Sequence, residues 1–146
     1  MADRAVVVAA WESLFRAQVA IMRSLAADFP SKEISLNEYD VMFNLSRQPG
    51  WRIRLRDLNK HVLLSQPSVS RLVDRLVSRG YLEKEIDPSD GRGAIIGLTQ
   101  PGYDLFRRVA RDHMVTITNR MSDSLDDAEL KQLIALCDRL REGAEN

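Results

Sequence analysis

The chain has 146 residues, of which 45% are hydrophobic and 29% are charged, and these values are typical of one soluble globular domain with its own core. The formal net charge is zero, so the overall charge by itself argues against a nucleic-acid-binding protein. The single cysteine, Cys137, excludes an internal disulfide and fits a reducing cytoplasm.

The N-terminal segment predicts a long amphipathic helix over about residues 7–29. Trp11, Phe15 and Met22 recur at helical spacing, and Pro30 ends the helix because it pushes the preceding residue out of the helical region. The apolar run at the start is short and has no basic leader or cleavage pattern, so we expect no signal peptide. We also expect no stretch that is long enough to span a bilayer.

Two shorter helices are predicted next. Ser35 and Glu38 form a capping box for a helix that ends near Leu45. A short helix then covers about residues 54–62, and a tight turn leads from it to Ser65.

The helix after this turn carries the strongest local signals. Ser65 is a good N-cap, and Pro67 lies in the first turn, where its missing N–H costs nothing. Gly80 occupies the C-terminal position that favours a left-handed backbone. The apolar side chains form one stripe that faces the core, made of Val69, Leu72, Val73, Leu76 and Val77.

A β-hairpin is predicted after Gly80. In residues 82–87, Leu82 and Ile86 fall on one face and acidic residues fall on the other, and residues 94–98 form the second strand. Residues 88–93 between the strands are rich in turn formers and predict a polar, flexible tip.

Two long helices complete the chain. Thr99 caps the first, and Asp126 with Glu129 forms a capping box for the second. The predicted fold class is mainly α with a small β-hairpin wing, a winged helix-turn-helix with additional N- and C-terminal helices.

Basic residues concentrate in one part of the chain. Residues 47–79 contain eight arginines or lysines and two aspartates, a local net charge of +6, so the remainder carries −6. A basic segment in an otherwise acidic chain is typical of a phosphate-facing surface. A solvated charged face is the usual alternative, so charge alone decides little.

The order of a short helix, a tight turn, a second helix and a hairpin predicts DNA binding. The second helix of such a pair enters the major groove with its N-terminal residues first. Because the apolar stripe faces the core, the small polar residues and the arginines lie on the free flank. Arg71 and Arg75, one turn apart, can each bind guanine or hold a phosphate.

Arg92 lies at the expected tip of the hairpin. An arginine on a loop beside a groove-binding helix can enter the adjacent minor groove, and Asp90 can hold its guanidinium extended. An ordinary turn with an exposed Asp–Arg pair explains the same residues equally well. The candidate DNA-binding residues are Arg54, Ser65, Gln66, Pro67, Ser68, Ser70, Arg71, Arg75, Asp90 and Arg92.

An ordered set of segments resembles the MarR family of winged helix-turn-helix transcription regulators. The family's wing signature, Asp-x-Arg followed after a short gap by Leu-Thr, matches Asp90, Arg92, Leu98 and Thr99. The likeness covers nearly the whole chain, and its segments are Leu64–Leu76, Gly80–Leu82, Asp87–Arg92, Leu98–Thr99 and Gly102.

The resemblance implies a single domain over residues 1–146 that forms a homodimer. Dimerisation helices would cover about residues 5–29 and 100–143, and the winged helix-turn-helix about residues 35–99. The large apolar residues in these outer helices, beyond what one small winged domain needs to cover, favour a dimer independently.

The resemblance also implies a mode of action. By position, Pro67, Ser68 and Arg71 would meet the major groove and Arg92 the minor groove, with Asp90 bracing Arg92. Family members commonly repress neighbouring genes and often release DNA when a small aromatic or phenolic ligand binds. A cytoplasmic repressor of a pseudo-palindromic site in double-stranded DNA is therefore the expected function.

Other classes of protein fit the sequence less well. We find no nucleophile elbow, Walker loop or dinucleotide fingerprint, so we predict that the chain is not an enzyme and has no cofactor. His61 and His113 fall on separate predicted helices, so we predict no metal site and expect His113 to pack in the core. A winged-helix module that binds proteins instead of DNA is the alternative, but its exposed surface would be apolar rather than cationic.

The cysteine and the two tryptophans can each be interpreted in two ways. Cys137 lies late in the last helix on its apolar side, which predicts a buried structural thiol rather than an oxidant sensor. Trp11 and Trp51 either line a pocket for an aromatic effector or pack in the core. No ligand-binding or membrane-binding residues are identified.

Overall fold

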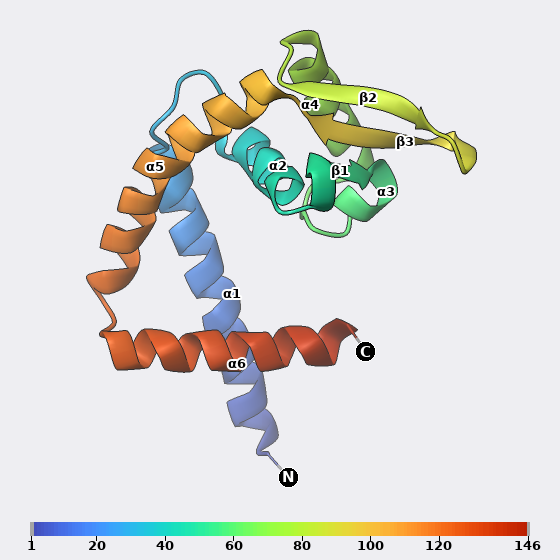
Figure 1. Cartoon of the computed structure of the whole chain (residues 1–146). Helices are drawn as coiled ribbons and strands as arrows, with labels where there is room; N and C mark the ends of the chain where they lie inside the picture. The colour runs from blue at the N-terminus through green and yellow to red at the C-terminus, as the bar shows by residue number, and fades with distance from the viewer. Residues whose placement is uncertain (1, 146) are drawn as a thin grey trace. The chain divides into compact units, whose positions relative to one another are not determined.

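The computed structural model describes residues 2–145 and divides them into two compact units (Figure 1). The central unit is Leu25–His113, and the helical unit consists of the residues up to Ser24 and from Met114 onward. The mainly α fold class with a small β-hairpin is confirmed. In chain order the elements are α1 (Arg4–Ala27), α2 (Leu36–Ser46), η1 (Pro49–Trp51), β1 (Arg52–Arg54), α3 (Leu55–Leu58), α4 (Gln66–Ser78), β2 (Leu82–Asp87), β3 (Asp90–Leu98), α5 (Gln100–Ser122) and α6 (Asp127–Glu145).

The hairpin of β2 and β3 belongs to a three-stranded antiparallel sheet with the order β1-β3-β2. Strand β1 was not predicted, and the short helix expected over residues 54–62 is reduced to α3. Arg54 is held extended because it pairs with Ile95 of β3. After Leu58 the chain forms tight turns, in which the amides of Lys60 and His61 donate to carbonyls three residues earlier.

The predicted ends of α2 and α4 are confirmed by their hydrogen bonds. The Ser35 Oγ accepts from the Glu38 amide at 3.1 Å, and Glu38 Oε1 accepts from the Ser35 amide at 2.9 Å. At the start of α4, the Ser65 Oγ accepts from the Ser68 amide at 3.3 Å. Gly80 follows α4 with φ +83°, the left-handed conformation that a helix C-terminus favours.

The core of the central unit lies between α2, α4, the sheet and the start of α5. Helix α4 buries the predicted apolar stripe except for Val77, which is half-buried, and its polar flank lies on the exposed side. Burial of this kind contributes about 1.5–3 kcal/mol for each large aliphatic side chain. The residues with 0% exposure are Val41, Met42, Leu45, Leu58, Val69, Val73, Leu76 and Ile96.

The hairpin differs from its prediction at the tip. The turn contains only Pro88 and Ser89, and β3 begins at Asp90. A β-bulge follows, because Asp87 pairs with Asp90 whereas Ile86 pairs with Ala94, which leaves residues 91–93 without partners in the ladder.

The burial pattern of β2 also differs from the prediction. Leu82 and Ile86 were expected to share a face, but only Leu82 is buried and Ile86 is 72% exposed. The reason is that the hairpin extends past the helices of the central unit (Figure 1). Asp87 was expected on the polar face, yet it is buried.

Thr99 joins the start of α5 to the end of α4. Its Oγ1 donates to the Gly80 carbonyl at 2.7 Å and accepts from the Gly102 amide at 3.1 Å, so its predicted role as a cap is confirmed. Gly102 packs against the chain at Tyr81, and a Cβ atom at Gly102 would lie 2.1 Å from the Tyr81 carbonyl oxygen. Trp51 stacks on Tyr103 with ring centroids 4.2 Å apart, and both residues are half-buried.

His113 is buried in an aromatic cluster, as predicted. Its ring centroid lies 5.1 Å from that of Phe29 and 4.9 Å from that of Tyr39, and Tyr39 stacks on Phe106. Within residues 2–145 the Nδ1 atom has no hydrogen-bond partner. Burial lowers the pKa of His113, so the ring is neutral at physiological pH.

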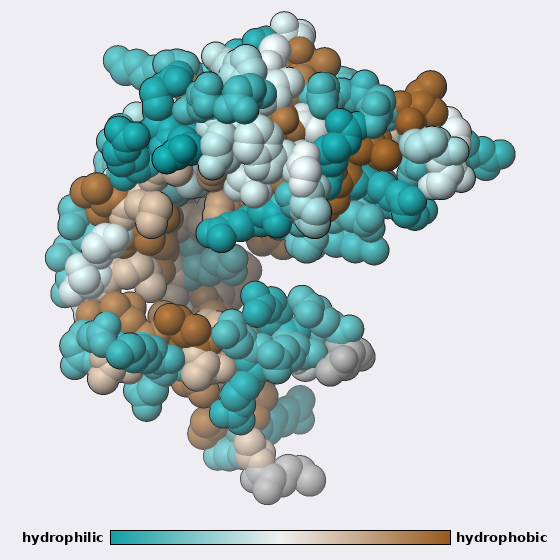
Figure 2. Space-filling model, viewed as in Figure 1, coloured by the Kyte–Doolittle hydropathy of each residue, from teal (hydrophilic) through white to brown (hydrophobic). Residues whose placement is uncertain are grey.

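The helical unit buries little of its apolar surface. Helix α6 has no buried residue, and in α1 only Leu25, which belongs to the central unit, is buried. Cys137 is half-buried, so the prediction of a buried thiol is not met in the single chain. Figure 2 shows apolar side chains on the surface of these helices. The large exposed ones are Val6, Val7, Val8, Trp11, Leu14, Phe15, Met22, Met114, Val115, Ile134, Leu136 and Leu140.

Helix α1 corrects one expectation from the sequence. It begins at Arg4 and ends at Ala27, and by length and composition alone it could cross a bilayer, so the expectation that no stretch is long enough is wrong. A single such helix near the N-terminus is weak evidence for a membrane span, and Glu12, Arg16 and Arg23 lie within it.

Candidate nucleic-acid interface

The N-terminal turn of α4 presents a cluster of small polar side chains. Ser65, Gln66 and Pro67 are exposed, and Ser68 is partly exposed. The Ser65 hydroxyl donates to the Ser68 Oγ at 2.8 Å, and Arg71 Nη2 lies 3.4 Å from the same oxygen. The amides of a helix N-terminus favour an anion.

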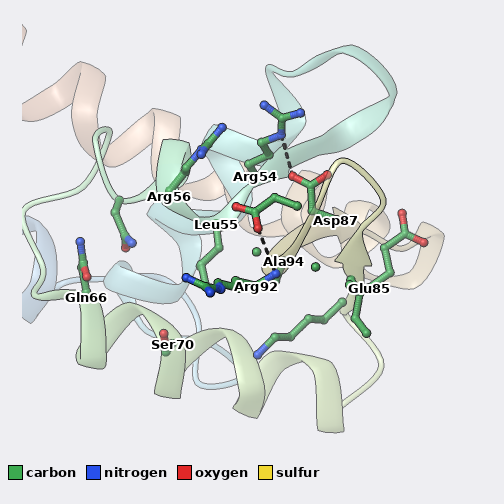
Figure 3. A pocket seen from close by; sticks show the side chains of 15 residues that line it. Arg54, Leu55, Arg56, Gln66, Ser70, Glu85, Asp87, Arg92 and Ala94 are labelled. Carbon is green, nitrogen blue, oxygen red and sulfur yellow. Dashed lines mark hydrogen bonds and ion pairs between the residues drawn. The ribbon is translucent and has the colours of Figure 1, made fainter.

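One groove of about 550 Å³ lies on the wing side of α4. Gln66 and Ser70 face it from α4, and the Arg92 side chain lies across it toward Leu55 (Figure 3). Its lining includes further residues from β1, from α3 and its C-cap, and from the hairpin, among them Arg54, Arg56, Asn59, Lys84 and Asp90.

A second groove of about 220 Å³ lies along the other side of α4. Ser68, Arg71 and Arg75 line it from α4, and Ser35 and Asn37 line it from the start of α2. The exposed flank of α4 therefore lies between two grooves, one bordered by the wing and one by the N-terminus of α2.

The structure pairs many of the basic residues with carboxylates. Arg52 forms ion pairs with Glu83 and Glu85, and Arg79 lies 3.9 Å from Glu38. These acids lie outside the basic segment of the sequence, so the local charge of +6 overstates the free positive charge. Other pairs join Arg54 to Asp87, Lys60 to Asp57 and Lys84 to Asp74.

Four arginines remain without an acidic partner at the two grooves. Arg56 and Arg92 line the wing-side groove, and Arg71 and Arg75 line the groove beside α2. Within residues 2–145 no carboxylate oxygen lies within the 4.0 Å ion-pair distance of these guanidinium groups. An unpaired guanidinium is available to bind a phosphate or a base edge.

Two predicted contacts differ in detail. Asp90 was expected to hold the Arg92 guanidinium, but Asp90 Oδ1 accepts from the Arg92 backbone amide at 3.1 Å instead. It therefore shapes the loop backbone and leaves the guanidinium free. Arg54 was expected to bind DNA, but its guanidinium is bound to Asp87 and Ser89, although its side chain is still 42% exposed.

Several residues that line the grooves were not predicted from the sequence. Arg56 was counted in the basic segment but was not predicted to bind DNA, because the predicted short helix did not indicate which way its side chain points. Asn37 was missed although Ser35 was identified as an N-cap, and a capped helix start is itself a signal for an anion-facing position. Lys84 could not be identified without the register of the hairpin.

Known proteins show the same fold and sequence features. Residues 33–93 match the family model described as MarR family. The HTH-type transcriptional regulator PecS of Dickeya dadantii is 25% identical over 135 residues, which cover 92% of this chain and 81% of PecS.

Two solved structures from Streptomyces coelicolor are similar over most of the chain. Sco3205, a MarR family transcriptional regulator in complex with DNA, is 26% identical with a TM-score of 0.80, covering 98% of this chain and 90% of Sco3205. The PcaV transcriptional regulator in complex with its natural ligand is 27% identical with a TM-score of 0.71, covering 90% of this chain and 91% of PcaV. In sequence and in fold the chain is similar to MarR family transcription regulators.

Proposed function

We propose that the chain is a cytoplasmic, homodimeric repressor that binds a pseudo-palindromic site in double-stranded DNA and is released by a small aromatic or phenolic ligand. The observation that carries the DNA-binding part is the position of the four unpaired arginines. They lie in pairs in the grooves on either side of α4. A helix in the major groove has a phosphate backbone on each side, so this charge pattern matches the DNA.

In this proposal the residues of α4 divide into two groups. Gln66, Pro67 and Ser70 approach base edges, and Ser65 and Ser68 hold a phosphate with the N-terminal amides of α4. Arg71 and Arg75 bind a base or the backbone along the α2 side. The DNA complex of Sco3205 supports this use of the fold.

The wing supplies the contact to the neighbouring groove. Arg92 is exposed on the hairpin, and Asp90 fixes the backbone beside it without neutralising its guanidinium. An arginine presented in this way fits a narrow minor groove, where the negative potential is strongest.

The dimer part and the ligand part of the proposal are supported by separate observations. The apolar faces of α1, α5 and α6 remain exposed in the single chain, and a second copy would cover them. A dimer also presents two copies of α4 to two half-sites, about 34 Å apart. The ligand part is supported by PcaV, which has been solved with its natural ligand.

A salt titration of duplex binding tests the DNA-binding part. A dimer that neutralises about six to ten phosphates loses affinity by on the order of 10³ or more between about 50 and 200 mM salt. Arg71→Ala should weaken specific binding by about 1–3 kcal/mol and relax the preference at one base if Arg71 reads that base. Absence of salt-sensitive duplex binding would contradict the proposal and favour a protein-binding winged helix.

The ligand part has its own test. A panel of benzoic acids and phenols is added to the protein–duplex complex, and release is followed by fluorescence anisotropy. At least one compound should release the duplex at a concentration that leaves the dimer folded. If every compound in the panel leaves the complex intact, the aromatic ligand is wrong and the DNA-binding proposal is unaffected.

A further inference from the structure

A side-chain cluster ties the tip of the wing to β1. Arg54 Nε lies 2.8 Å from Asp87 Oδ2, and Arg54 Nη2 donates to the Ser89 Oγ at 3.0 Å. Asp87 Oδ1 accepts from the Ser89 amide at 2.9 Å and from the Ser89 hydroxyl at 2.7 Å. Figure 3 shows Arg54 and Asp87 facing each other. We call Arg54, Asp87 and Ser89 the wing clasp.

The wing clasp joins two strands that are not neighbours in the sheet. β1 and β2 pair with opposite edges of β3, so no backbone hydrogen bond links them. Asp87 ends β2, Ser89 lies in the turn, and Arg54 ends β1. The Arg54 side chain therefore spans the width of the sheet and fixes the turn from its far edge.

The backbone around the turn needs such support. Residues 91–93 are unpaired in the ladder, and two of them are glycines, which are free to adopt many conformations. Asp87 is charged and only 4% exposed, and a buried carboxylate is stable only with hydrogen-bond or ionic partners. The hydrogen bonds from Ser89, assisted by the charge of Arg54, hold the pKa of Asp87 below its ordinary value, so the carboxylate is ionised at neutral pH.

We propose that Arg54 is a positioning residue of the wing, which holds the turn so that Arg92 is presented to the DNA, and that Arg54 itself does not contact DNA. This inference rests on the proposed DNA-binding function. It separates Arg54 from the four unpaired arginines. Within residues 2–145, Arg54 is the only arginine lining either groove that is bound to both a carboxylate and a hydroxyl.

Asp87→Asn gives the sharpest test, because the two roles of Arg54 predict opposite signs. The probe is a duplex that the wild-type chain selects from a random-sequence library. If Arg54 binds phosphate directly, removal of the neighbouring negative charge frees it and strengthens binding. If Arg54 positions the wing, Asp87→Asn opens the clasp and weakens binding, by on the order of tenfold.

A double-mutant cycle tests whether Arg54 acts through Arg92. Arg54→Gln should weaken binding in the wild-type chain and cause no further loss in the Arg92→Ala chain, because the wing then has no contact left to misplace. Arg52→Gln is the matched control, since Arg52 lies on the same strand and is paired with Glu83 and Glu85 away from the turn. Its effect should be small and should add to that of Arg92→Ala.

Hydrogen exchange without DNA measures the clasp directly. The amides of residue 89 and of Arg92, which donate to Asp87 Oδ1 and Asp90 Oδ1, should exchange faster in Arg54→Gln and in Ser89→Ala by on the order of tenfold, and should be unchanged in Arg52→Gln. Thermal unfolding of each variant checks that the fold is intact, and Ser89→Ala is the milder change if Asp87→Asn is unstable.

Two results would overturn the inference. One is tighter or unchanged binding by Asp87→Asn, and the other is full additivity of Arg54→Gln with Arg92→Ala. Wild-type protein that binds no duplex contradicts the proposed function instead. In that case hydrogen exchange still tests the clasp. Wing amides that exchange in Arg54→Gln and Ser89→Ala at the wild-type rate would show that the clasp does not hold the turn.

Discussion

The two units of the chain differ in how they obtain a core. The central unit buries aliphatic side chains from α2, α4 and the sheet at 0% exposure. The helical unit leaves aromatic and aliphatic side chains of α1, α5 and α6 more than one third exposed. A unit with its own core is stable by internal packing, whereas a unit without one depends on another surface. The helical unit therefore presents the apolar surface that the proposed dimer would cover.

A charge on the apolar face of α1 should have the largest effect. Phe15→Asp would place an unpaired carboxylate in the proposed dimer interface, at a cost of about 3–5 kcal/mol, and should abolish dimerisation and operator binding. Sedimentation velocity measures the mass, and circular dichroism checks the central unit. Arg16→Ala on the same helix is the control, and a Phe15→Asp dimer of normal affinity would contradict the assignment of this face.

A core truncation in the central unit should lower the stability of the chain without acting on the proposed dimer interface. Leu76→Ala empties space at a side chain of 0% exposure and should lower the free energy of unfolding by about 2–5 kcal/mol. Leu63→Ala, at a side chain that is 94% exposed, should change it little. Urea titration gives both values. An equal decrease in the free energy of unfolding for the two variants would show that Leu76 does not lie in the core.

The contact between the end of α4 and the start of α5 should be the next most sensitive. Gly102→Ala brings a Cβ to within 2.1 Å of the Tyr81 carbonyl oxygen and should cost about 1–3 kcal/mol. Gly143→Ala is the matched control, because nothing lies within 4 Å of its new Cβ and alanine favours a helix. A neutral Gly102→Ala variant would mean that α5 approaches Tyr81 less closely.

The smallest expected effect is a dependence of stability on pH. His113 is buried with a lowered pKa, so the unfolded chain takes up a proton near pH 6.5 while the folded chain does not. The contribution of the neutral ring is complete above pH 6.5 and declines as the pH falls below it. His113→Leu should remove this decline, and exposed His61→Gln should retain it. Urea titrations at pH 8 and at pH 5.5, with ~0.1 M salt, measure the free energy of unfolding of each variant. An equal decline in the wild type and in His113→Leu would contradict the assignment to His113.

Local signals predicted much of the fold. The caps at Ser35, Ser65 and Thr99, the left-handed Gly80 and the apolar stripe of α4 involve residues within one or two turns of each other, so the sequence alone identifies them. The direction in which α4 presents its polar flank follows from the same stripe.

Non-local pairing was not predictable. Strand β1 exists only because β3, about 40 residues away, pairs with it. The carboxylates that bind Arg52 and Arg54 are more than 30 residues distant, so the sequence could not tell the paired arginines from the free ones. For the same reason Arg54 was grouped with the DNA-binding residues, and Arg56 was not.

In the proposed dimer, each subunit places the flank of its α4, between two arginine-lined grooves, against one half-site of duplex DNA. The most direct measurement is selection of bound duplexes from a random-sequence library, followed by footprinting of the winner. We predict a pseudo-palindrome with half-sites about 10 bp apart, and protection on both sides of each half-site. Enrichment of no sequence, or of a single unrepeated half-site with no protection at its flanks, would contradict the claim.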